Sequence, residues 1–331
     1  MPFFYWCTIV WNSPSAVSNL PKMSKVNQSE AKRFKGPKKW LEYLLARAFV
    51  SLMQRTPVWV NDLVGHAMGW FCWKFLKRRR ATVRQNLEVV QEWMEAHGHA
   101  TSSVPMERQG REGFVRSGAN LFSGIRLAQL PGQKLEHYLQ VEGLEALRAT
   151  IAQDAGAILV LAHMGPWEAL SNLAPLIARK GVTFKFGAMY RPLNNTYLDR
   201  WYHKQRQAQG AALYSRRDGF HKPVDFIRKG GMLAILADQK MRQGPSVPFM
   251  GREVTTMPLP GLFMRRAKAP MLSAALFKTG ARRWCIRFEI VDFEADADLG
   301  DRAVCARRVN QALEQVLACS VVDGFWFQKR F

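Results

Sequence analysis

The stretch ILVLAHMGPWEA, residues 158–169, places a histidine directly after a short apolar run. Five consecutive apolar residues have the length and composition of a strand that is buried on both faces. The Gly-Pro pair that follows indicates a turn, and the fixed φ of Pro166 suits the first position of a helix. His163 is therefore predicted at the carboxyl end of a strand, with Glu168 in the first turn of the next helix.

Similar apolar runs alternate with helix-length segments along the rest of the chain. The expected strands are 157–162, 183–190, 211–214, 232–237, 270–277 and 284–293, and the expected helices are 167–180, 195–210, 222–229, 260–267 and 301–319. This alternation is typical of α/β folds with helices on both faces of a sheet. We expect a mixed, mostly parallel central sheet flanked by helices.

The segment before this region is rich in aromatic residues and ends in a cationic run, residues 74–84, with the sequence KFLKRRRATVR. Charged and polar residues interrupt every window of the roughly 18 apolar residues that a membrane-spanning helix needs. Two helices that break near Pro57 and lie in a membrane interface are the preferred interpretation. Two core helices of a soluble domain are the alternative.

These patterns divide the chain into three parts. Residues 1–38 are expected to be a flexible tail, because a polar start at Met23 follows an apolar stretch that has no signal-peptide cleavage site. Residues 39–83 are expected to form a helical membrane-associated segment. Residues 84–331 are expected to form a catalytic domain.

The charge of the chain limits its partners. The sequence has 48 Lys and Arg against 26 Asp and Glu, a formal net charge of +22. Nucleic acid, an anionic membrane face or an acidic carrier protein would each suit such a surface. The five cysteines are scattered without metal-ligand spacing, which indicates a reducing compartment and no zinc site.

His163 and Glu168 suggest acid–base chemistry. Because the chain reverses between them, the carboxylate could swing back to the imidazole, fix one tautomer and stabilise the imidazolium. The start of the helix could offer N–H groups to a developing negative charge. No G-x-S-x-G elbow or nearby cysteine supplies a nucleophile, so the base would activate a hydroxyl of the substrate. A structural histidine at this position is the alternative.

At these residues the chain resembles the lauroyl/myristoyl acyltransferases of lipid A biosynthesis, within the H-x4-D/E glycerolipid acyltransferases. HMGPWE, 163–168, is similar to the family's His-x4-Glu motif. Further blocks follow in family order: RQNL at 84–87, YRPLNNTYLD at 190–199, ADQK at 237–240, SVPFMG at 246–251 and GFWFQKRF at 324–331. Ordered agreement over several blocks is more specific than the His-Glu spacing.

The resemblance implies that His163 and Glu168 act as a catalytic dyad in acyl transfer. The donor would be an acyl carrier protein thioester or acyl coenzyme A, and the acceptor a hydroxyl of a lipid A precursor or similar glycolipid. Arg191 would bind an acceptor phosphate or the oxyanion, and Asp238 and Gln239 would orient Arg191 or the sugar. The resemblance implies no cofactor, no metal and no nucleic acid, and it implies a place on the cytoplasmic face of a bacterial inner membrane.

The chain departs from the family pattern at two positions. Lys240 follows Asp-Gln where many relatives carry an acidic or small polar residue, and Gln328 replaces a common histidine. These differences leave other acceptors open, such as a phosphatidylinositol mannoside acylated from acyl coenzyme A. A hydrolase and a non-enzymatic basic membrane-binding protein remain the further alternatives.

Overall fold

A seven-stranded mixed sheet forms the centre of the computed structural model, which describes residues 35–152, 156–215, 219–293 and 297–331. The strand order is β1-β9-β8-β2-β5-β3-β4, and only the β8–β9 pair is antiparallel. The strands are β1 (Leu139–Glu142), β2 (Ala157–Leu161), β3 (Lys185–Tyr190), β4 (Ala212–Ser215), β5 (Gly231–Leu236), β8 (Met271–Gly280) and β9 (Arg283–Ile290). The mostly parallel sheet predicted from the sequence is confirmed.

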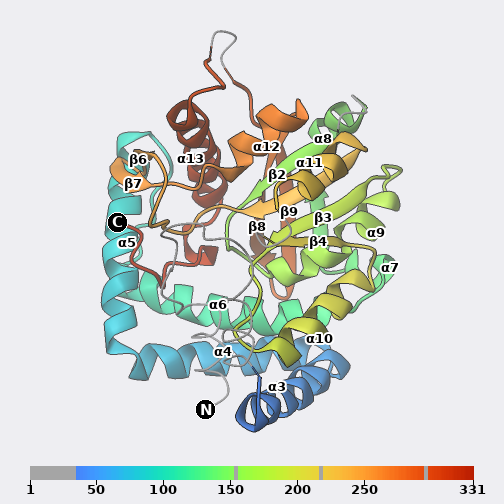
Figure 1. The fold of residues 1–331 in the computed structure, drawn as a ribbon. Coiled ribbons are helices and arrows are strands. Elements are labelled where there is room, and N and C mark those ends of the chain that lie inside the picture. Colours follow the sequence, from blue (N-terminus) through green and yellow to red (C-terminus); the bar gives the residue numbers. More distant parts are fainter. Residues whose placement is uncertain (1–34, 153–155, 216–218, 294–296) are drawn as a thin grey trace.

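Helices cover the sheet and extend beyond it (Figure 1). They are α3 (Pro37–Arg55), α4 (Val58–Phe75), α5 (Lys77–Ala96), α6 (Met106–Leu127), α7 (Gly132–Leu135), α8 (Leu144–Ile151), α9 (Leu173–Ala178), α10 (Thr196–Gln207), α11 (His221–Arg228), α12 (Leu259–Ala267) and α13 (Arg302–Ala318). α11, α12 and α13 pack against β5, β2 and β8. β2 is buried at all five positions, as its apolar composition predicts.

Two expectations about the elements need correction. The helix expected over 167–180 is a 3₁₀ helix, η1 (Trp167–Asn172), followed by the short α9. Three strands were not expected from the sequence: β1 and the small antiparallel pair β6 (Ser246–Phe249) and β7 (Arg252–Thr255). Two helices do flank Pro57, and within the described residues no helix is both long and apolar enough to cross a membrane. The tail expected at 1–38 lies almost entirely outside the described residues.

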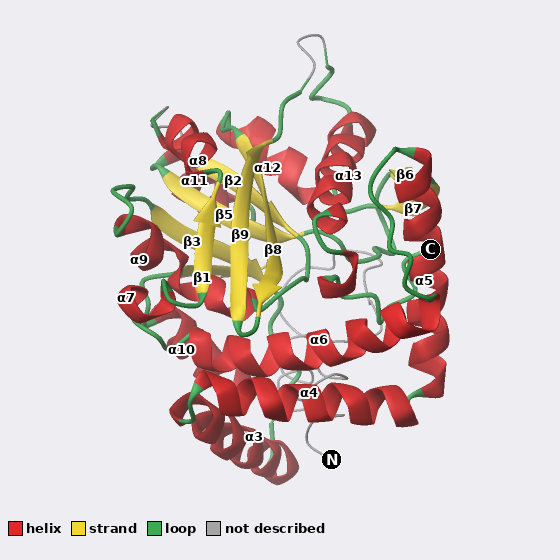
Figure 2. Cartoon of the chain, turned by 180° about the vertical axis from the view of Figure 1, so that it is seen from behind, coloured by secondary structure: helices red, strands yellow, loops and turns green. Residues whose placement is uncertain are grey.

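α6 crosses one end of the sheet, and α4 lies beneath it on the side away from the strands (Figure 2). The two helices approach so closely that a Cβ added at Gly65 would lie 2.5 Å from the Gly118 carbonyl oxygen. A Cβ at Gly118 would lie 2.3 Å from the Gly65 carbonyl oxygen. Glycine at both positions therefore allows direct backbone contact, and α6 is held between the sheet end and α4.

Candidate active site

The parallel register of β2 and β5 brings His163 and Asp238 together. Leu161 lies opposite Leu236, and the ladder continues with a hydrogen bond from the Ala237 amide to the Leu161 carbonyl. His163 and Asp238 each follow their strand by two residues, so they leave the sheet at equivalent points. The Nδ1 atom of His163 lies 2.6 Å from Oδ1 of Asp238. This pair sits where functional groups of open α/β sheets gather, at the carboxyl ends of the strands.

The hydrogen bonds of His163 assign its tautomer. An ionised carboxylate can only accept, so Nδ1 carries the proton that is donated to Asp238. In the neutral imidazole Nε2 is then the acceptor, and it lies 3.3 Å from the amide nitrogen of Gln239. The rings of Trp167 and Phe325 flank the imidazole, at 5.6 and 6.2 Å between centroids. The histidine is thus held with its basic nitrogen directed toward groups that donate hydrogen bonds.

The environment of Asp238 keeps its carboxylate ionised. Burial raises its pKa, but the attraction and hydrogen bonds of His163, with a smaller contribution from Arg330, more than offset this and lower the pKa below its usual range. Its side chain is 10% exposed and that of His163 13%. A negative charge in so dry a position can stabilise an imidazolium strongly.

Glu168 does not contact His163, in contrast to the expectation from the sequence. Its carboxylate makes a bidentate ion pair with Arg206 of α10, with Nη2 at 2.7 and 2.9 Å and Nε at 3.3 Å from the carboxylate oxygens. Burial lowers the pKa of Arg206, but Glu168 raises it by more, so the net pKa lies above the ordinary value. Glu168 therefore holds α10 against the turn that carries the histidine.

The turn itself explains why Glu168 points away. Gly165 has φ +59°, and a Cβ there would lie 2.2 Å from the Leu276 carbonyl oxygen, so the position requires glycine. η1 then starts after Pro166, and the space beside it is filled by α6, because Gly124 packs against Pro166 and Glu168 with an added Cβ only 3.5 Å away. The chain reverses, as the sequence indicates, but the 3₁₀ geometry turns the carboxylate toward α10.

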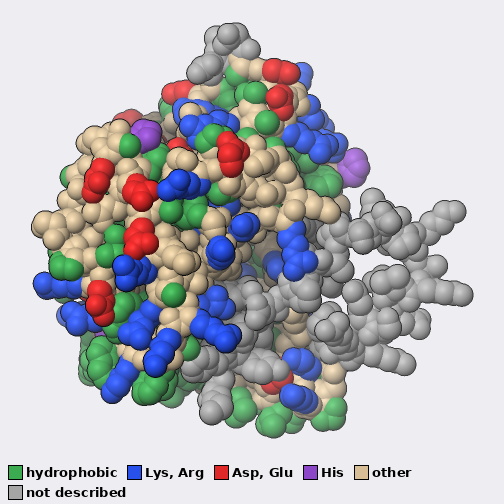
Figure 3. Space-filling view, turned by 90° about the vertical axis from the view of Figure 1, so that its left-hand side faces the viewer, with side chains coloured by type: hydrophobic (Ala, Val, Ile, Leu, Met, Phe, Trp, Pro, Cys, Tyr) green, Lys and Arg blue, Asp and Glu red, His purple; other side chains and the backbone are tan. Residues whose placement is uncertain are grey.

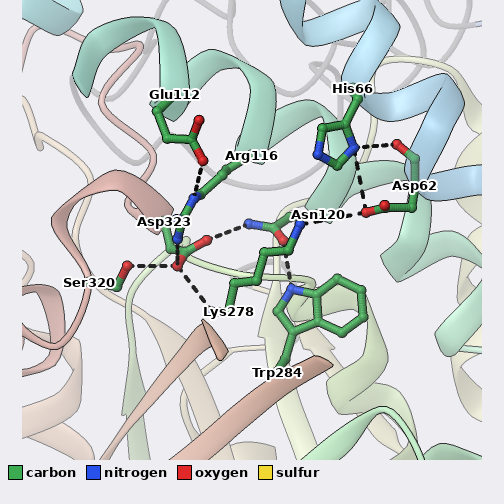
Figure 4. Close-up of polar contacts among 9 residues, drawn as sticks. All are labelled: Asp62, His66, Glu112, Arg116, Asn120, Lys278, Trp284, Ser320 and Asp323. Carbon is green, nitrogen blue, oxygen red and sulfur yellow. Dashed lines mark hydrogen bonds and ion pairs between the residues drawn. The ribbon is translucent and has the colours of Figure 1, made fainter. Parts of the chain in front are cut away.

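A buried carboxylate that sequence reasoning missed, Asp323, is bonded to side chains of α6 and of the C-terminal segment (Figure 4). It belongs to η3 (Val321–Asp323), after α13. Its oxygens accept hydrogen bonds at 2.7–3.1 Å from Arg116 Nη1, Asn120 Nδ2, Ser320 Oγ and the Lys278 amide. Gly324 then bridges to Met164, next to the histidine. Asp323 thereby ties α6, β8 and the C-terminal segment to the site, and no local pattern signals this role.

The proposed binding residues do not gather at one point. Gln239 contacts His163, as described, and Asp238 contacts His163 rather than Arg191. Arg191 lies exposed in the loop after β3 and makes no hydrogen bond or ion pair with any described residue. In the described ranges, no three His, Cys, Asp or Glu residues come together in a way that could hold a metal ion.

Comparisons with known proteins identify the family of this chain. Residues 28–331 match the family model described as bacterial lipid A biosynthesis acyltransferase. The lipid A biosynthesis palmitoleoyltransferase of Escherichia coli K12 is 24% identical over 307 residues, 91% of this chain and 94% of the relative. The lipid A biosynthesis acyltransferase of Shigella flexneri matches to the same extent. The lauroyltransferase of Escherichia coli K12 is 22% identical over 318 residues, 95% of this chain and 96% of the relative. The chain belongs to the bacterial lipid A biosynthesis acyltransferase family, and it is an acyltransferase.

Proposed function

We propose that this acyltransferase moves a fatty acyl chain from the thioester of acyl carrier protein to a hydroxyl of a lipid A precursor, with His163 as general base. The observation that carries the proposal is the hydrogen bond between His163 Nδ1 and Asp238, which makes Nε2, in contact with the Gln239 amide, the nitrogen that takes a proton. The charge of +22 suits an acidic carrier and a phosphorylated acceptor. Acyl coenzyme A is the alternative donor.

The reaction follows from the orientation of the imidazole. Nε2 removes the proton of the acceptor hydroxyl while that oxygen attacks the thioester carbonyl. Asp238 stabilises the resulting imidazolium through Nδ1, as the carboxylate does in a Ser-His-Asp triad. When the tetrahedral intermediate collapses, the C–S bond breaks and the leaving thiolate takes the proton from Nε2. The products are an ester on the acceptor and the free thiol of the carrier.

Two further residues are proposed to prepare this geometry. The Gln239 amide contacts Nε2 of His163 in this structure. When the acceptor binds, its hydroxyl would take this place at Nε2, and the Gln239 amide could then donate a hydrogen bond to the hydroxyl oxygen. Glu168, placed on Arg206, is proposed as a positioning residue for the histidine turn rather than as a direct partner of the imidazole. Arg191, exposed beside the carboxyl end of β3, remains proposed as a contact for an acceptor phosphate.

Mass spectrometry tests this function directly. Purified protein is incubated with lauroyl-acyl carrier protein or lauroyl coenzyme A and a tetra-acylated lipid A precursor. The expected result is a mass gain of one acyl chain on the precursor, faster with the carrier protein, together with one free thiol per ester. Free fatty acid as the only product, with the acceptor unchanged, would instead make the protein a hydrolase.

We further propose that α3 and α4 form a surface that lies on the cytoplasmic face of the inner membrane. Ten large apolar side chains of these helices are exposed: Trp40, Leu41, Leu45, Phe49, Leu52, Trp59, Leu63, Trp70, Phe71 and Phe75. Several recur at helical spacing, as at 41, 45 and 52 and at 59, 63 and 70, which gives each helix an apolar outer stripe. Hydrophobic side chains gather beside Lys and Arg along the lower edge in Figure 3, the side of α3 and α4 in Figure 1.

The position of this surface suits a lipid acceptor. α6 packs on the histidine turn, α4 packs on α6, and the exposed stripe of α4 lies on its outer side. Lys74, Lys77 and Arg78 are exposed where α4 meets α5, so cations border the apolar stripe. This combination is typical of helices that lie in the interface of an anionic membrane.

Vesicle binding checks the membrane surface. The triple variant Leu41→Ser, Leu52→Ser and Leu63→Ser is expected to bind phosphatidylglycerol vesicles at least about 100-fold more weakly, since each leucine that the membrane buries contributes at least about 1 kcal/mol. The matched control is Leu299→Ser, an exposed leucine away from these helices. Co-sedimentation that is equal for both variants would show that another surface meets the membrane.

A further inference from the structure

The C-terminal arginine of the active-site region, Arg330, has an unusual environment. Its side chain is only 4% exposed, and its guanidinium carbon lies 4.6 Å from the centre of the Phe249 ring. Nη1 donates a long hydrogen bond of 3.4 Å to the Thr255 carbonyl. Nε and Nη2 are buried and have no hydrogen-bond partner among the described residues. A buried cation therefore keeps the N–H donors of two nitrogens unused.

The backbone holds this side chain in place. The Asn86 amide donates to the carbonyls of Trp326 and Gln328 at 2.8 and 2.6 Å, and its oxygen accepts from the Arg330 amide at 3.4 Å. α5 therefore fixes the last residues of the chain from the side. The unpaired donors of Arg330 are a built feature of the site, since the segment that carries them is anchored up to the amide of the arginine itself.

Nε and Nη2 form one edge of the guanidinium, the edge that binds two oxygens of a carboxylate or phosphate side by side. In Arg206 the same edge binds the carboxylate of Glu168. In Arg330 the edge has no acceptor among the described residues. Leaving such an edge without an acceptor in a buried position costs several kcal/mol. An arginine held in this way is suited to receive an oxyanion from outside the chain.

Arg330 also lines a small cavity. It has a volume of about 20 Å³, and its lining includes Arg330, Lys240, Gln239 and Asp238. A space of this size admits about one or two oxygen atoms, so only the oxygens of a larger group would enter. Gln239 also contacts Nε2 of His163, so the cavity lies next to the proposed base. Two cationic side chains, Arg330 and Lys240, line the cavity with one carboxylate, Asp238, which is hydrogen-bonded to His163.

Asp238 attracts Arg330 and raises its pKa, but the two side chains are not paired. No hydrogen bond or ion pair joins the two among the described residues, although Arg330 helps to lower the pKa of Asp238. Burial lowers the pKa of Arg330 to about 10, so the guanidinium stays charged near neutral pH. The charge that the cavity offers is therefore positive under the conditions in which the enzyme works.

We infer that Arg330, with Lys240 at the mouth of the cavity, binds a phosphate group of the substrate beside His163. This inference rests on the proposed acyl transfer, in which both substrates carry phosphate: the glycolipid acceptor on its sugar and the carrier donor in its phosphopantetheine arm. The bound phosphate would align that substrate with Nε2. Its two oxygens would complete the donor edge that the protein leaves unpaired.

Substrate pairs with and without phosphate test this site kinetically. Arg330→Gln is expected to lower kcat/KM on the order of 100-fold, chiefly through KM, for the substrate whose phosphate it binds. Arg330→Lys should recover only part of this loss, because lysine keeps the charge but not the paired donors. Exposed Arg148, which pairs with Glu145 far from the site, provides the matched control Arg148→Gln.

The substrate that supplies the phosphate is identified by the preference for phosphate that the Arg330→Gln variant loses. If the acceptor is bound, wild type prefers a phosphorylated over a dephosphorylated acceptor and Arg330→Gln does not. If the donor is bound, the same holds for lauroyl-acyl carrier protein against a lauroyl N-acetylcysteamine thioester. An equal loss by Arg330→Gln on all four substrates, or no loss, would overturn the phosphate site while leaving acyl transfer intact.

A binding measurement separates this site from the reaction. Inorganic phosphate is expected to raise the Tm of wild type and of Arg148→Gln, but not of Arg330→Gln. If wild type transfers no acyl chain to any acceptor, the proposed function fails, and this shift still decides whether Arg330 binds phosphate. An identical shift in all three proteins would place the bound phosphate elsewhere and overturn the inference.

Discussion

Replacing His163 with alanine is expected to lower kcat by about 10³-fold, with KM changed little. The loss removes the only group proposed to take the hydroxyl proton, and nothing else about the binding surfaces changes. Asp238 would then face a void instead of an imidazole, so the carboxylate could not act in its place. Single-turnover assays followed by mass spectrometry of the acceptor measure the effect on the chemical step.

The control for this prediction must separate chemistry from folding. His163 packs against Trp167 and Phe325, so the Tm and the near-ultraviolet circular dichroism of the His163→Ala protein are compared with those of wild type. Exposed His137→Ala provides a matched loss of imidazole outside the site and should keep the wild-type rate. A folded His163→Ala protein that acylates at the wild-type rate would mean that this histidine is structural.

The strands that are easiest to predict from the sequence are those buried on both faces of the sheet. β2, β5 and β8 are covered on both faces, so nearly every residue must be apolar and the run is visible in the sequence. β1 was missed because this four-residue edge strand alternates buried and exposed residues. The β6–β7 pair was missed because Pro248 lies inside β6, and proline ordinarily argues against a strand.

The site was predictable in part for the same reason. The sequence places His163 and Asp238 each directly after a buried strand, and the ends of neighbouring parallel strands meet at one edge of a sheet. Which strands are neighbours depends on the order in the sheet, and β2 and β5 are adjacent although the register partners Leu161 and Leu236 lie 75 positions apart in the sequence. The direction of Glu168 depends on a backbone turn at Gly165 and on the packing of α6, which sequence spacing does not encode.

Replacing Asp238 with asparagine is expected to lower kcat by about 10⁴-fold, the loss found when the corresponding aspartate of a Ser-His-Asp triad becomes asparagine. The asparagine amide can donate to Nδ1, which would then have to accept and leave the proton on Nε2. The base would thus hold the wrong tautomer while the shape of the site is kept. KM should change little, because the two side chains have nearly the same volume.

Glu168→Gln separates the two carboxylates. It breaks the bidentate pair with Arg206 and should lower the free energy of unfolding by about 2 kcal/mol, since the pair is partly buried. Its kinetic loss should be shared with Arg206→Gln, so that the double variant is little worse than either single one, whereas combination with Asp238→Asn should be additive. If Glu168→Gln is coupled instead to Asp238→Asn, then Glu168 reaches His163 during the reaction, and the dyad inferred from the sequence describes the working enzyme better than the resting contacts do.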